Sequence, residues 1–133
     1  MQTTEVLNIS TARRTQFVSI TAKIAEIIAA KGFQDGVLTI FVPHTTAGVT
    51  INENADPDVV RDMEWFSDQL IPQSYHFNHS EGNSDAHIKS SFYGSSVQVI
   101  IRNGRMCLGT WQGIYFCEFD GPRKREIYLA FTS

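Results

Sequence analysis

Cysteines, long apolar runs and an excess of positive charge are all scarce in this sequence. Its two cysteines, Cys107 and Cys117, are not spaced as a CxxC pair, which argues against a scaffold held together by disulfides. The first twenty residues contain no long apolar stretch behind a basic start, so we expect neither a signal peptide nor a membrane anchor, and we predict a cytoplasmic protein. Eleven basic residues stand against fourteen acidic ones, and the net charge of -3 argues against broad electrostatic binding of nucleic acid or anionic membranes.

Internal repeats and low-complexity segments are also lacking, and the 133 residues, 42% of them hydrophobic, fit a single domain over residues 1–133. Alternating and β-branched residues predict strands at 3–9, 15–20, 36–42, 48–52, 97–101, 105–108, 111–119 and 126–132. We expect the first two strands to pair with each other, and Asn103-Gly104 to form a two-residue hairpin turn. The nearly continuous β-rich run 36–42 predicts a strand at the centre of the sheet, buried on both faces.

Three helices complete the predicted element order. Thr21 can cap a first helix, Asp56 a second and Ser84 a short third one, and Gly32 and Gly94 supply stop signals for the first and the third. The second helix carries an apolar stripe that we expect to cover the core: Val59, Met63, Phe66 and Leu70. No helix separates the late strands, so the order predicts an α+β fold, a mostly antiparallel sheet sandwich with two main helices and a short one.

The stretch 74–93 holds three of the four histidines. Residues 75–83 are polar and lack an apolar period, which predicts a loop of unusual length, and such loops are usually functional or disordered. The short helix that follows would place His87 at its third position. There the helix dipole and the unpaired N–H groups disfavour a protonated imidazole, so we expect His87 to be neutral and able to bind a metal or meet an anion.

Together with His87, the histidines His44 and His79 make a set of three. They are expected in a loop at a strand end, in a polar loop and at a helix start, three kinds of position from which a site can be built. His44 follows the predicted central strand, where Thr45 and Thr46 leave backbone and hydroxyl donors free for a ligand. Three neutral imidazoles with one open position are the ligands of a catalytic zinc site. The spacing of these histidines matches no short zinc motif, so separate surface or hydrogen-bonded histidines are the alternative.

Glu118 is the unusual residue of its predicted strand, because alternation places it on the same face as Ile114 and Phe116. Such a carboxylate has either a raised pKa or a dedicated partner, and either would suit a general base or a group that orients a ligand histidine. The alternative is an exposed glutamate on an edge strand. Cys117 on the opposite face is expected to pack as a buried small apolar residue. The basic run 123–125 predicts either a phosphate contact or a solvated turn.

Three long runs resemble the signature segments of the YjbQ-like family, also described as secondary thiamine-phosphate synthases: PHTTAGVTINENADPDV, HSEGNSDAHIKSS and LGTWQGIYFCEFDGPR. They appear in the family's order, with similar spacing, and the resemblance covers essentially the whole chain. It implies an α+β sandwich-like fold that assembles as a homotrimer. It also implies that the motif histidines His44, His79 and His87 share one metal.

The resemblance further places Asn54, Asp85 and Glu118 at matching motif positions, and we predict catalytic roles for them. We predict that the substrate is bound by Thr45, Thr46, Lys89 and Arg123. Family members resemble enzymes that join the pyrimidine diphosphate and thiazole phosphate halves of thiamine, an activity that looks secondary, so we expect a phosphorylated small-molecule substrate. Three imidazoles suit zinc better than magnesium, so zinc is the favoured divalent metal. The alternatives are a metal-dependent hydrolase with Glu118 as base, and a non-catalytic trimeric protein whose histidine pocket holds an anion.

Overall fold

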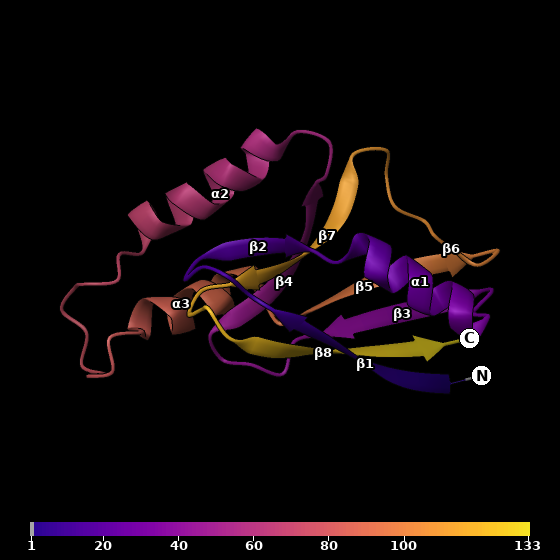
Figure 1. The fold of residues 1–133 in the computed structure, drawn as a ribbon, viewed down its shortest axis with the longest axis horizontal. Helices are drawn as coiled ribbons and strands as arrows, with labels where there is room; N and C mark the ends of the chain where they lie inside the picture. Colours follow the sequence, from indigo (N-terminus) through magenta and orange to yellow (C-terminus); the bar gives the residue numbers. More distant parts are fainter. Residues whose placement is uncertain (1) are drawn as a thin grey trace.

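The computed structural model describes residues 2–133 and folds them into two antiparallel sheets and three helices (Figure 1), which confirms the predicted α+β sandwich. The helices are α1 (Thr21–Lys31), α2 (Pro57–Leu70) and α3 (Ser84–Tyr93). The strands are β1 (Gln2–Ser10), β2 (Gln16–Ser19), β3 (Gly36–Phe41), β4 (Ala47–Glu53), β5 (Ser96–Arg102), β6 (Arg105–Met106), β7 (Gln112–Glu118) and β8 (Lys124–Thr132). Within this range, no helix is long and apolar enough to cross a membrane.

The five-stranded sheet has the order β1-β8-β3-β5-β6, and the three-stranded sheet has the order β2-β7-β4. The prediction that the first two strands pair with each other is wrong, because β1 pairs with β8 along its whole length while β2 pairs with β7 in the other sheet. A long pairing with a distant strand is more stable than a short pairing with a neighbouring one. Closeness in the sequence does not reveal which of the two pairings forms. The Asn103-Gly104 turn between β5 and β6 is confirmed, and both residues adopt the positive φ that this turn requires, 52° and 76°.

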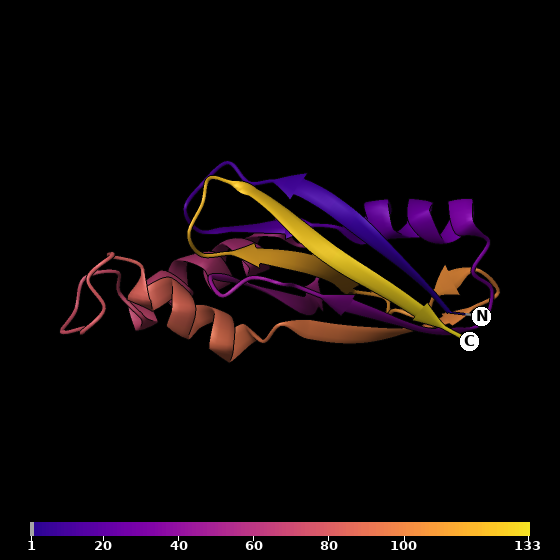
Figure 2. The ribbon, with the colours of Figure 1, turned by 90° about the horizontal axis from the view of Figure 1, so that it is seen from below.

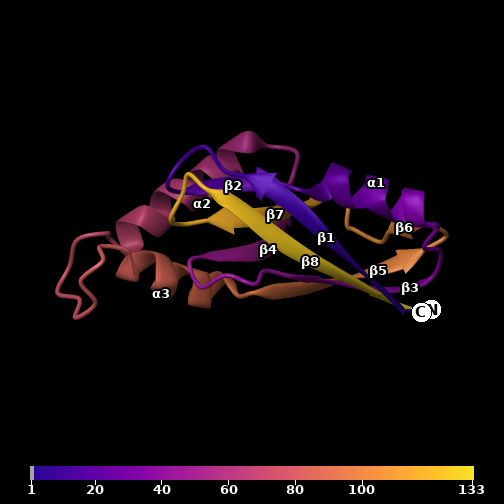
Figure 3. The same cartoon turned by 60° about the horizontal axis from the view of Figure 1, so that its bottom comes forward.

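β3 lies at the centre of the five-stranded sheet, as predicted, but only one of its faces is buried. Leu38 and Ile40 are 1% and 0% exposed, whereas Val37 and Phe41 on the other face are 37% and 42% exposed. The expectation of burial on both faces is therefore wrong. No helix covers the outer face of this sheet within residues 2–133 (Figures 2 and 3). Its register places further exposed apolar side chains beside these two: Val6, Ile100 and Tyr128.

β7 separates two apolar clusters, because its side chains alternate between its two faces. Ile114 and Phe116 enter the main core between the sheets, while Tyr115 and Cys117 pack toward α2 and α3. This alternation is the predicted one, and Cys117 is fully buried as expected, with burial raising the pKa of its thiol.

The helix signals were predicted with mixed success. The Asp56 side chain caps α2 by accepting a hydrogen bond from Asp58 N–H at 2.9 Å, as predicted. The predicted caps Thr21 and Ser84 are wrong, since both are first helical residues and the caps are Ile20 and Asn83. Thr21 instead accepts a hydrogen bond from the N–H of Ile114 in β7.

The apolar stripe of α2 covers the core only in part, because Met63 packs against the cluster that contains Tyr115 and Cys117 while the end of the stripe is exposed. Phe66 and Leu70 are 57% and 60% exposed, and the buried residues of this helix are Glu64 and Ser67. Glu64 accepts a hydrogen bond from the N–H of Phe17 at 2.6 Å, so α2 is fixed through a carboxylate to the edge of β2. The stripe faces α3 across an open groove.

The loop between α2 and α3, residues 71–83, protrudes at one end of the molecule, and the two chain ends lie together at the opposite end (Figures 1, 2 and 3). α3 begins at the base of this loop and packs against β4. The predicted long polar loop is thus confirmed, and it stands beside the residues that carry the candidate site.

Candidate functional site

His44 lies in the loop that joins β3 to β4, with its ring edge against the backbone of Glu126 in β8. Its Nε2 is 3.0 Å from the Glu126 nitrogen and 3.1 Å from the Glu126 carbonyl oxygen. Burial, together with the nearby positive charge of Arg125, lowers the pKa of His44 below its ordinary value. The imidazole is therefore neutral at pH 7. The Glu126 N–H donates to Nε2, and with Nε2 as acceptor the neutral ring carries its proton on Nδ1, where it can donate to a ligand. The other tautomer, in which Nε2 donates to the Glu126 carbonyl, leaves Nδ1 free to bind a metal or to accept a proton.

Two cavities share His44 as part of their walls. The first, of about 470 Å³, is lined by imidazole and hydroxyl groups from the β3–β4 loop and α3: His44, Thr45, His87, Ser90, Ser91 and Ser95. The second, of about 930 Å³, is lined mainly by polar and basic groups: Asn8, Ser10, Lys23, Lys124, Arg125 and Glu126. A ligand that contacts His44 can therefore reach a histidine-rich surface on one side and a basic surface on the other.

His87 is the fourth residue of α3, one position later than predicted, because the helix is capped by Asn83. Its ring lies next to that of His79 from the protruding loop, with 5.6 Å between ring centres and an angle of 82° between ring planes. His79 itself lines a different cavity at the loop. The structure thus brings His87 close to His79 and into one cavity with His44, but it does not bring the three rings together at one point.

The chemistry of these histidines suits metal binding, but their positions in the structure suit it less well. Three imidazoles suit a transition metal, and a ring that donates to a carbonyl, as His44 does in the tautomer with its proton on Nε2, is typical of a ligand histidine. Among residues 2–133, however, no three histidine, cysteine, aspartate or glutamate side chains are positioned to hold a metal ion. A shared metal therefore stays a prediction.

Glu118 has a dedicated partner, which is one of the two possibilities that its sequence position raised. It is fully buried and forms a two-pronged ion pair with Arg125, which is 4% exposed. It also accepts hydrogen bonds from the Thr11 hydroxyl at 2.8 Å and the Asp120 N–H at 3.0 Å. Burial alone would raise the pKa of Glu118, but the Arg125 guanidinium and these donors lower it. The exposed-glutamate alternative is wrong, and the carboxylate has no free oxygen with which to act as a base.

Thr46 belongs to the same network. It was predicted to be free for a ligand, and it is not. Arg125 donates to its hydroxyl at 2.8 Å and to its carbonyl at 3.2 Å, and the residue is 5% exposed. Thr45 lines the first cavity, where its carbonyl accepts a hydrogen bond from Ser90. Arg123 donates hydrogen bonds to the backbone oxygen and to the carboxylate of Asp120. In the basic run 123–125, Arg125 points into the core, whereas Arg123 and Lys124 are exposed, so a phosphate contact stays a prediction for the exposed part of the run.

Asp85 and Lys89, predicted to act in catalysis and in substrate binding, form a second buried ionic network. Asp85 is 0% exposed and accepts two hydrogen bonds from Arg14, at 2.9 and 3.0 Å. Lys89 is 1% exposed and donates to Asp85 at 2.8 Å and to Asp68 of α2 at 2.7 Å. Burial alone would raise the pKa of Asp85, but Arg14 and Lys89 lower it. The network fastens α3 to α2 and to the turn before β2.

Asn54 lies apart from the histidines. β4 begins at Ala47, close to His44, and its seven residues span about 20 Å before Asn54. The Asn54 side chain accepts a hydrogen bond from the Tyr115 hydroxyl at 3.1 Å. The structure therefore does not bring this predicted catalytic residue to the site.

Two arginines that the sequence reading missed turn out to organise both networks. Arg125 follows the same alternation as Ile127 and Leu129, which are 0% and 2% exposed, so its register in β8 was a usable signal of burial. Arg14 lies in an irregular turn before β2, and no pattern in the sequence links it to Asp85, which is 71 positions away.

Comparison with known proteins gives a consistent result. A family model described as UPF0047 protein YjbQ-like matches residues 5–133. UPF0047 protein MJ1081 of Methanocaldococcus jannaschii is 55% identical over 121 residues, which cover 91% of this chain and 88% of that protein. UPF0047 protein YugU of Bacillus subtilis is 50% identical over 126 residues, covering 94% and 96%.

Solved structures agree with the relatives. The crystal structure of an uncharacterised conserved protein of the YjbQ/UPF0047 family from Clostridium acetobutylicum matches with a TM-score of 0.93 and 49% identity, covering 96% of this chain and 99% of that one. A YbjQ-like protein of unknown function from Sulfolobus solfataricus matches with a TM-score of 0.92 and 29% identity, covering 98% and 96%. With its three motif runs, its α+β sandwich and its near full-length matches, the chain belongs to the UPF0047/YjbQ-like family.

Proposed function

We propose that the chain is an enzyme that acts on a phosphorylated small molecule bound across the two cavities that meet at His44. The observation that carries this proposal is the position of a neutral imidazole between a surface rich in histidine and hydroxyl groups and a surface rich in basic groups. Phosphate groups are held by basic side chains, and neutral imidazoles accept protons or bind metals. A single ligand could use both surfaces.

The roles of individual residues follow from their surroundings. Lys23 and Lys124 line the second cavity, and no ion pair within residues 2–133 involves either of them, so both charges are free to attract a phosphate. Arg125 is committed to Glu118 and would hold the wall of the cavity in place. His44 would present Nδ1 to a metal ion in the tautomer whose Nε2 donates to the Glu126 carbonyl, and this contact would orient its ring. This arrangement suits the joining of a diphosphate-bearing and a phosphate-bearing molecule, the reaction that the family resemblance implies.

A divalent metal is part of the proposal, with zinc favoured over magnesium. His44, His79 and His87 would hold it, and when bound it would polarise an oxygen of the substrate. His79 stands on the protruding loop, and its ring centre lies 5.6 Å from that of His87. The hydrolase alternative loses support, because Glu118 was its base and has no free oxygen.

Metal content is the direct test. Purified wild type should contain about one transition-metal ion per chain. His44→Ala, His79→Ala and His87→Ala should each lose most of it, as measured by elemental analysis. His76→Ala is the matched control, because this histidine lies in the same loop but outside the family motif, and it should keep the metal. Equal metal content in all five proteins would remove the metal from the proposal.

Phosphate binding is tested separately by calorimetric titration with inorganic pyrophosphate. Lys23→Ala and Lys124→Ala should each weaken binding roughly 10-fold or more, because a hydrogen bond between charged groups contributes about 1.5–3 kcal/mol. Lys31→Ala is the control, since Lys31 is also on α1 but pairs with Glu5 at 3.0 Å, away from the second cavity. Unchanged binding in both cavity variants would contradict the assignment of this surface to phosphate.

We also propose that the protein assembles as a homotrimer. The support is the uncovered apolar face of the five-stranded sheet, where the rings of Phe41 and Tyr128 lie side by side with their centres 6.4 Å apart and both are more than a third exposed. Exposed apolar faces of this kind are commonly buried between subunits.

A further inference from the structure

Ser90 lies on α3 one helical turn after His87, and its hydroxyl group connects the two chain segments that carry His44 and His87. Its Oγ is 2.6 Å from the carbonyl oxygen of Thr45, the residue that follows His44, and 2.9 Å from the carbonyl oxygen of His87. Ser90 is 9% exposed, so water competes little for these contacts. One buried hydroxyl therefore bridges the β3–β4 loop and α3 beside the first cavity.

The proton of this hydroxyl belongs to the contact with Thr45. A hydroxyl donates one hydrogen bond, and the contact with Thr45 is the shorter of the two. The His87 carbonyl also accepts from the hydroxyl of Ser91, at 3.1 Å, so it has a donor without Ser90. The Thr45 carbonyl has no other hydrogen-bond donor within residues 2–133. Loss of the Ser90 hydroxyl would therefore release the loop from α3 at the residue next to His44.

The end of α3 is fixed to both sides of the β3–β4 loop. The N–H of Val42, just after β3, donates to the Ser95 carbonyl at 2.8 Å, and the N–H of Val49 in β4 donates to the Gly94 carbonyl at 3.1 Å. The contact with β4 is so close that a Cβ atom on Gly48 would lie 2.7 Å from the Gly94 carbonyl oxygen. Because glycine has no Cβ, it permits this approach. α3 therefore cannot shift along β4 without breaking these hydrogen bonds.

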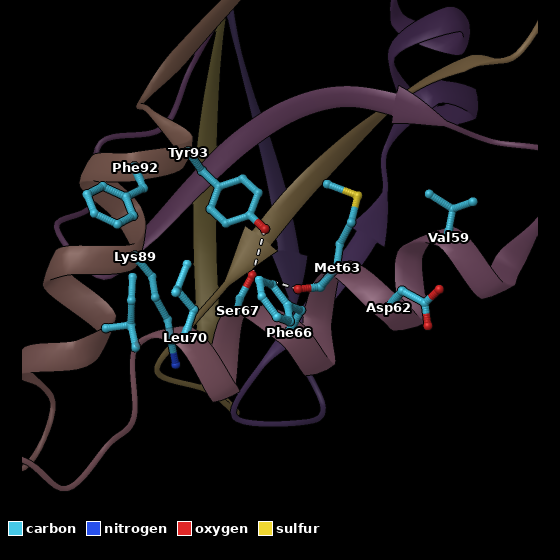
Figure 4. Close-up of a pocket in the computed structure, with 10 residues that line it drawn as sticks. Val59, Asp62, Met63, Phe66, Ser67, Leu70, Lys89, Phe92 and Tyr93 are labelled. Carbon is cyan, nitrogen blue, oxygen red and sulfur yellow. Dashed lines mark hydrogen bonds between the residues drawn. The ribbon is translucent and has the colours of Figure 1, made fainter.

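The opposite side of α3 is fixed to α2 (Figure 4). There the Tyr93 hydroxyl oxygen lies 2.6 Å from Oγ of Ser67. On the same helix, Lys89 donates a hydrogen bond to Asp68 of α2 at 2.7 Å. α3 is therefore held from two sides and carries His87 on a fixed support. The position of the β3–β4 loop relative to His87 then depends on how this loop is attached to the helix.

We propose that Ser90 is a positioning residue whose hydroxyl fixes the spacing between His44 and His87, so that one ligand in the first cavity contacts both imidazoles. This inference rests on the proposed function, in which the two histidines act on the same ligand. Groups that act together on a ligand must be held within about 0.5 Å of the productive geometry. Ser90 provides this precision through the Thr45 carbonyl, and it takes no part in proton transfer or bond breaking.

The first measurement is the NMR signal of the His44 ring in the ligand-free protein. The ring lies edge-to-face with Phe116, with 6.5 Å between ring centres, so the ring current of Phe116 makes the Cε1–H signal of His44 sensitive to its position. Ser90→Ala should move this signal at about pH 8, where the His44 ring is neutral. Ser91→Ala is the matched control and should leave the signal in place, because Ser91 donates to the same His87 carbonyl but does not contact the loop.

A conservative variant separates positioning from a general loss of packing. Ser90→Thr keeps the hydroxyl and should keep the His44 signal close to its wild-type position. A His44 signal that is unchanged in Ser90→Ala, or that moves equally in Ser91→Ala, would overturn the proposal.

The second measurement is the energetic coupling of the two histidines through one ligand. Calorimetric titration with inorganic pyrophosphate of the wild type, His44→Ala, His87→Ala and the double variant gives this coupling. The double variant should lose less affinity than the product of the two single losses, by roughly 2-fold or more. In the Ser90→Ala background the two losses should become independent, whereas Ser91→Ala should keep the coupling.

The two measurements separate this inference from the proposed function. A wild type that does not bind pyrophosphate would contradict the proposed function, and the His44 signal, which needs no ligand, would still decide the role of Ser90. Coupling that persists unchanged in the Ser90→Ala background would overturn the positioning role even if the proposed function holds.

Discussion

Replacing Glu118 by glutamine should destabilise the fold strongly, although the change removes only a charge and keeps the shape. In the native protein, Oε1 accepts from Arg125 Nε at 2.9 Å and from the Thr11 hydroxyl, while Oε2 accepts from Arg125 Nη2 and the Asp120 N–H. A glutamine must put its NH2 group in one of these two positions. In either orientation an N–H of Arg125 then faces another donor, because the guanidinium cannot rotate away as a hydroxyl can.

The expected loss is large because the arginine stays charged. Breaking a buried ion pair by removing one partner typically costs about 3–5 kcal/mol. For a domain of this size, that corresponds to a fall in Tm on the order of 10–20 °C. Thermal unfolding followed by circular dichroism at one fixed protein concentration measures it, since concentration affects the Tm of an oligomer.

Two variants make the result interpretable. Glu126→Gln changes an exposed glutamate of the same region whose side chain accepts a hydrogen bond from the Tyr128 hydroxyl at 3.4 Å, and it should alter stability by less than about 0.5 kcal/mol. The double variant Glu118→Leu/Arg125→Met removes both charges and should recover at least half of the loss, because apolar replacement of a whole buried pair is often neutral. A loss below about 1 kcal/mol for Glu118→Gln would refute the view that this pair is buried and essential to the fold.

Three other predictions follow from the charges and the surface. The pKa values of Glu118 and Asp85 are lowered in the folded protein, so their contribution to stability is complete above the ordinary carboxyl pKa of about 4 and is lost as the pH falls through the lowered values. The Tm should therefore drop steeply below about pH 4. The drop should be less steep in Glu118→Gln, which lacks one of the two carboxylates. The His44 ring proton should titrate in NMR with a midpoint below about 6.5, and a midpoint above that value would show that the ring is not desolvated. Sedimentation velocity should show a trimer at micromolar concentration, and Phe41→Glu on the exposed sheet face should shift it toward monomer; a monomeric wild type would contradict the assembly.

Much of the fold could be predicted because its signals are local. The cap of α2 at Asp56, the Gly32 stop of α1 and the Asn103-Gly104 turn each depend on neighbouring residues and specific backbone angles. The pairing of β1 with β8 depends on residues more than a hundred positions apart and has no local signal. The central position of β3 was predicted correctly, but its one-sided burial was not, since a β-rich run does not tell how many of its faces are covered.

In the candidate site, too, features with a local signal in the sequence could be predicted and features without one could not. Positions such as His44 and His87 stood out because of their residue type and their place at the ends of elements, and they do line one cavity. The partners of the charged residues could not be read in the same way. Glu118 was recognised as unusual by its alternation, yet Arg125 was missed because its strand was predicted to begin at residue 126, two residues after its start at Lys124. Arg14 reaches Asp85 from an irregular turn, and only the three-dimensional structure pairs them.

The pairing of β1 with β8 has a practical consequence for handling the protein. Gln2 and Thr132 are direct partners in this pair, whereas Glu126, whose backbone holds His44, lies opposite Asn8, about 20 Å further along the strand. A fusion tag, a fluorophore or a tether to a sensor chip attached at either end would therefore emerge at the pole of the molecule opposite to the loop 71–83. Immobilised protein should present its histidine-lined cavity to the solution, and both ends can carry labels without crowding it.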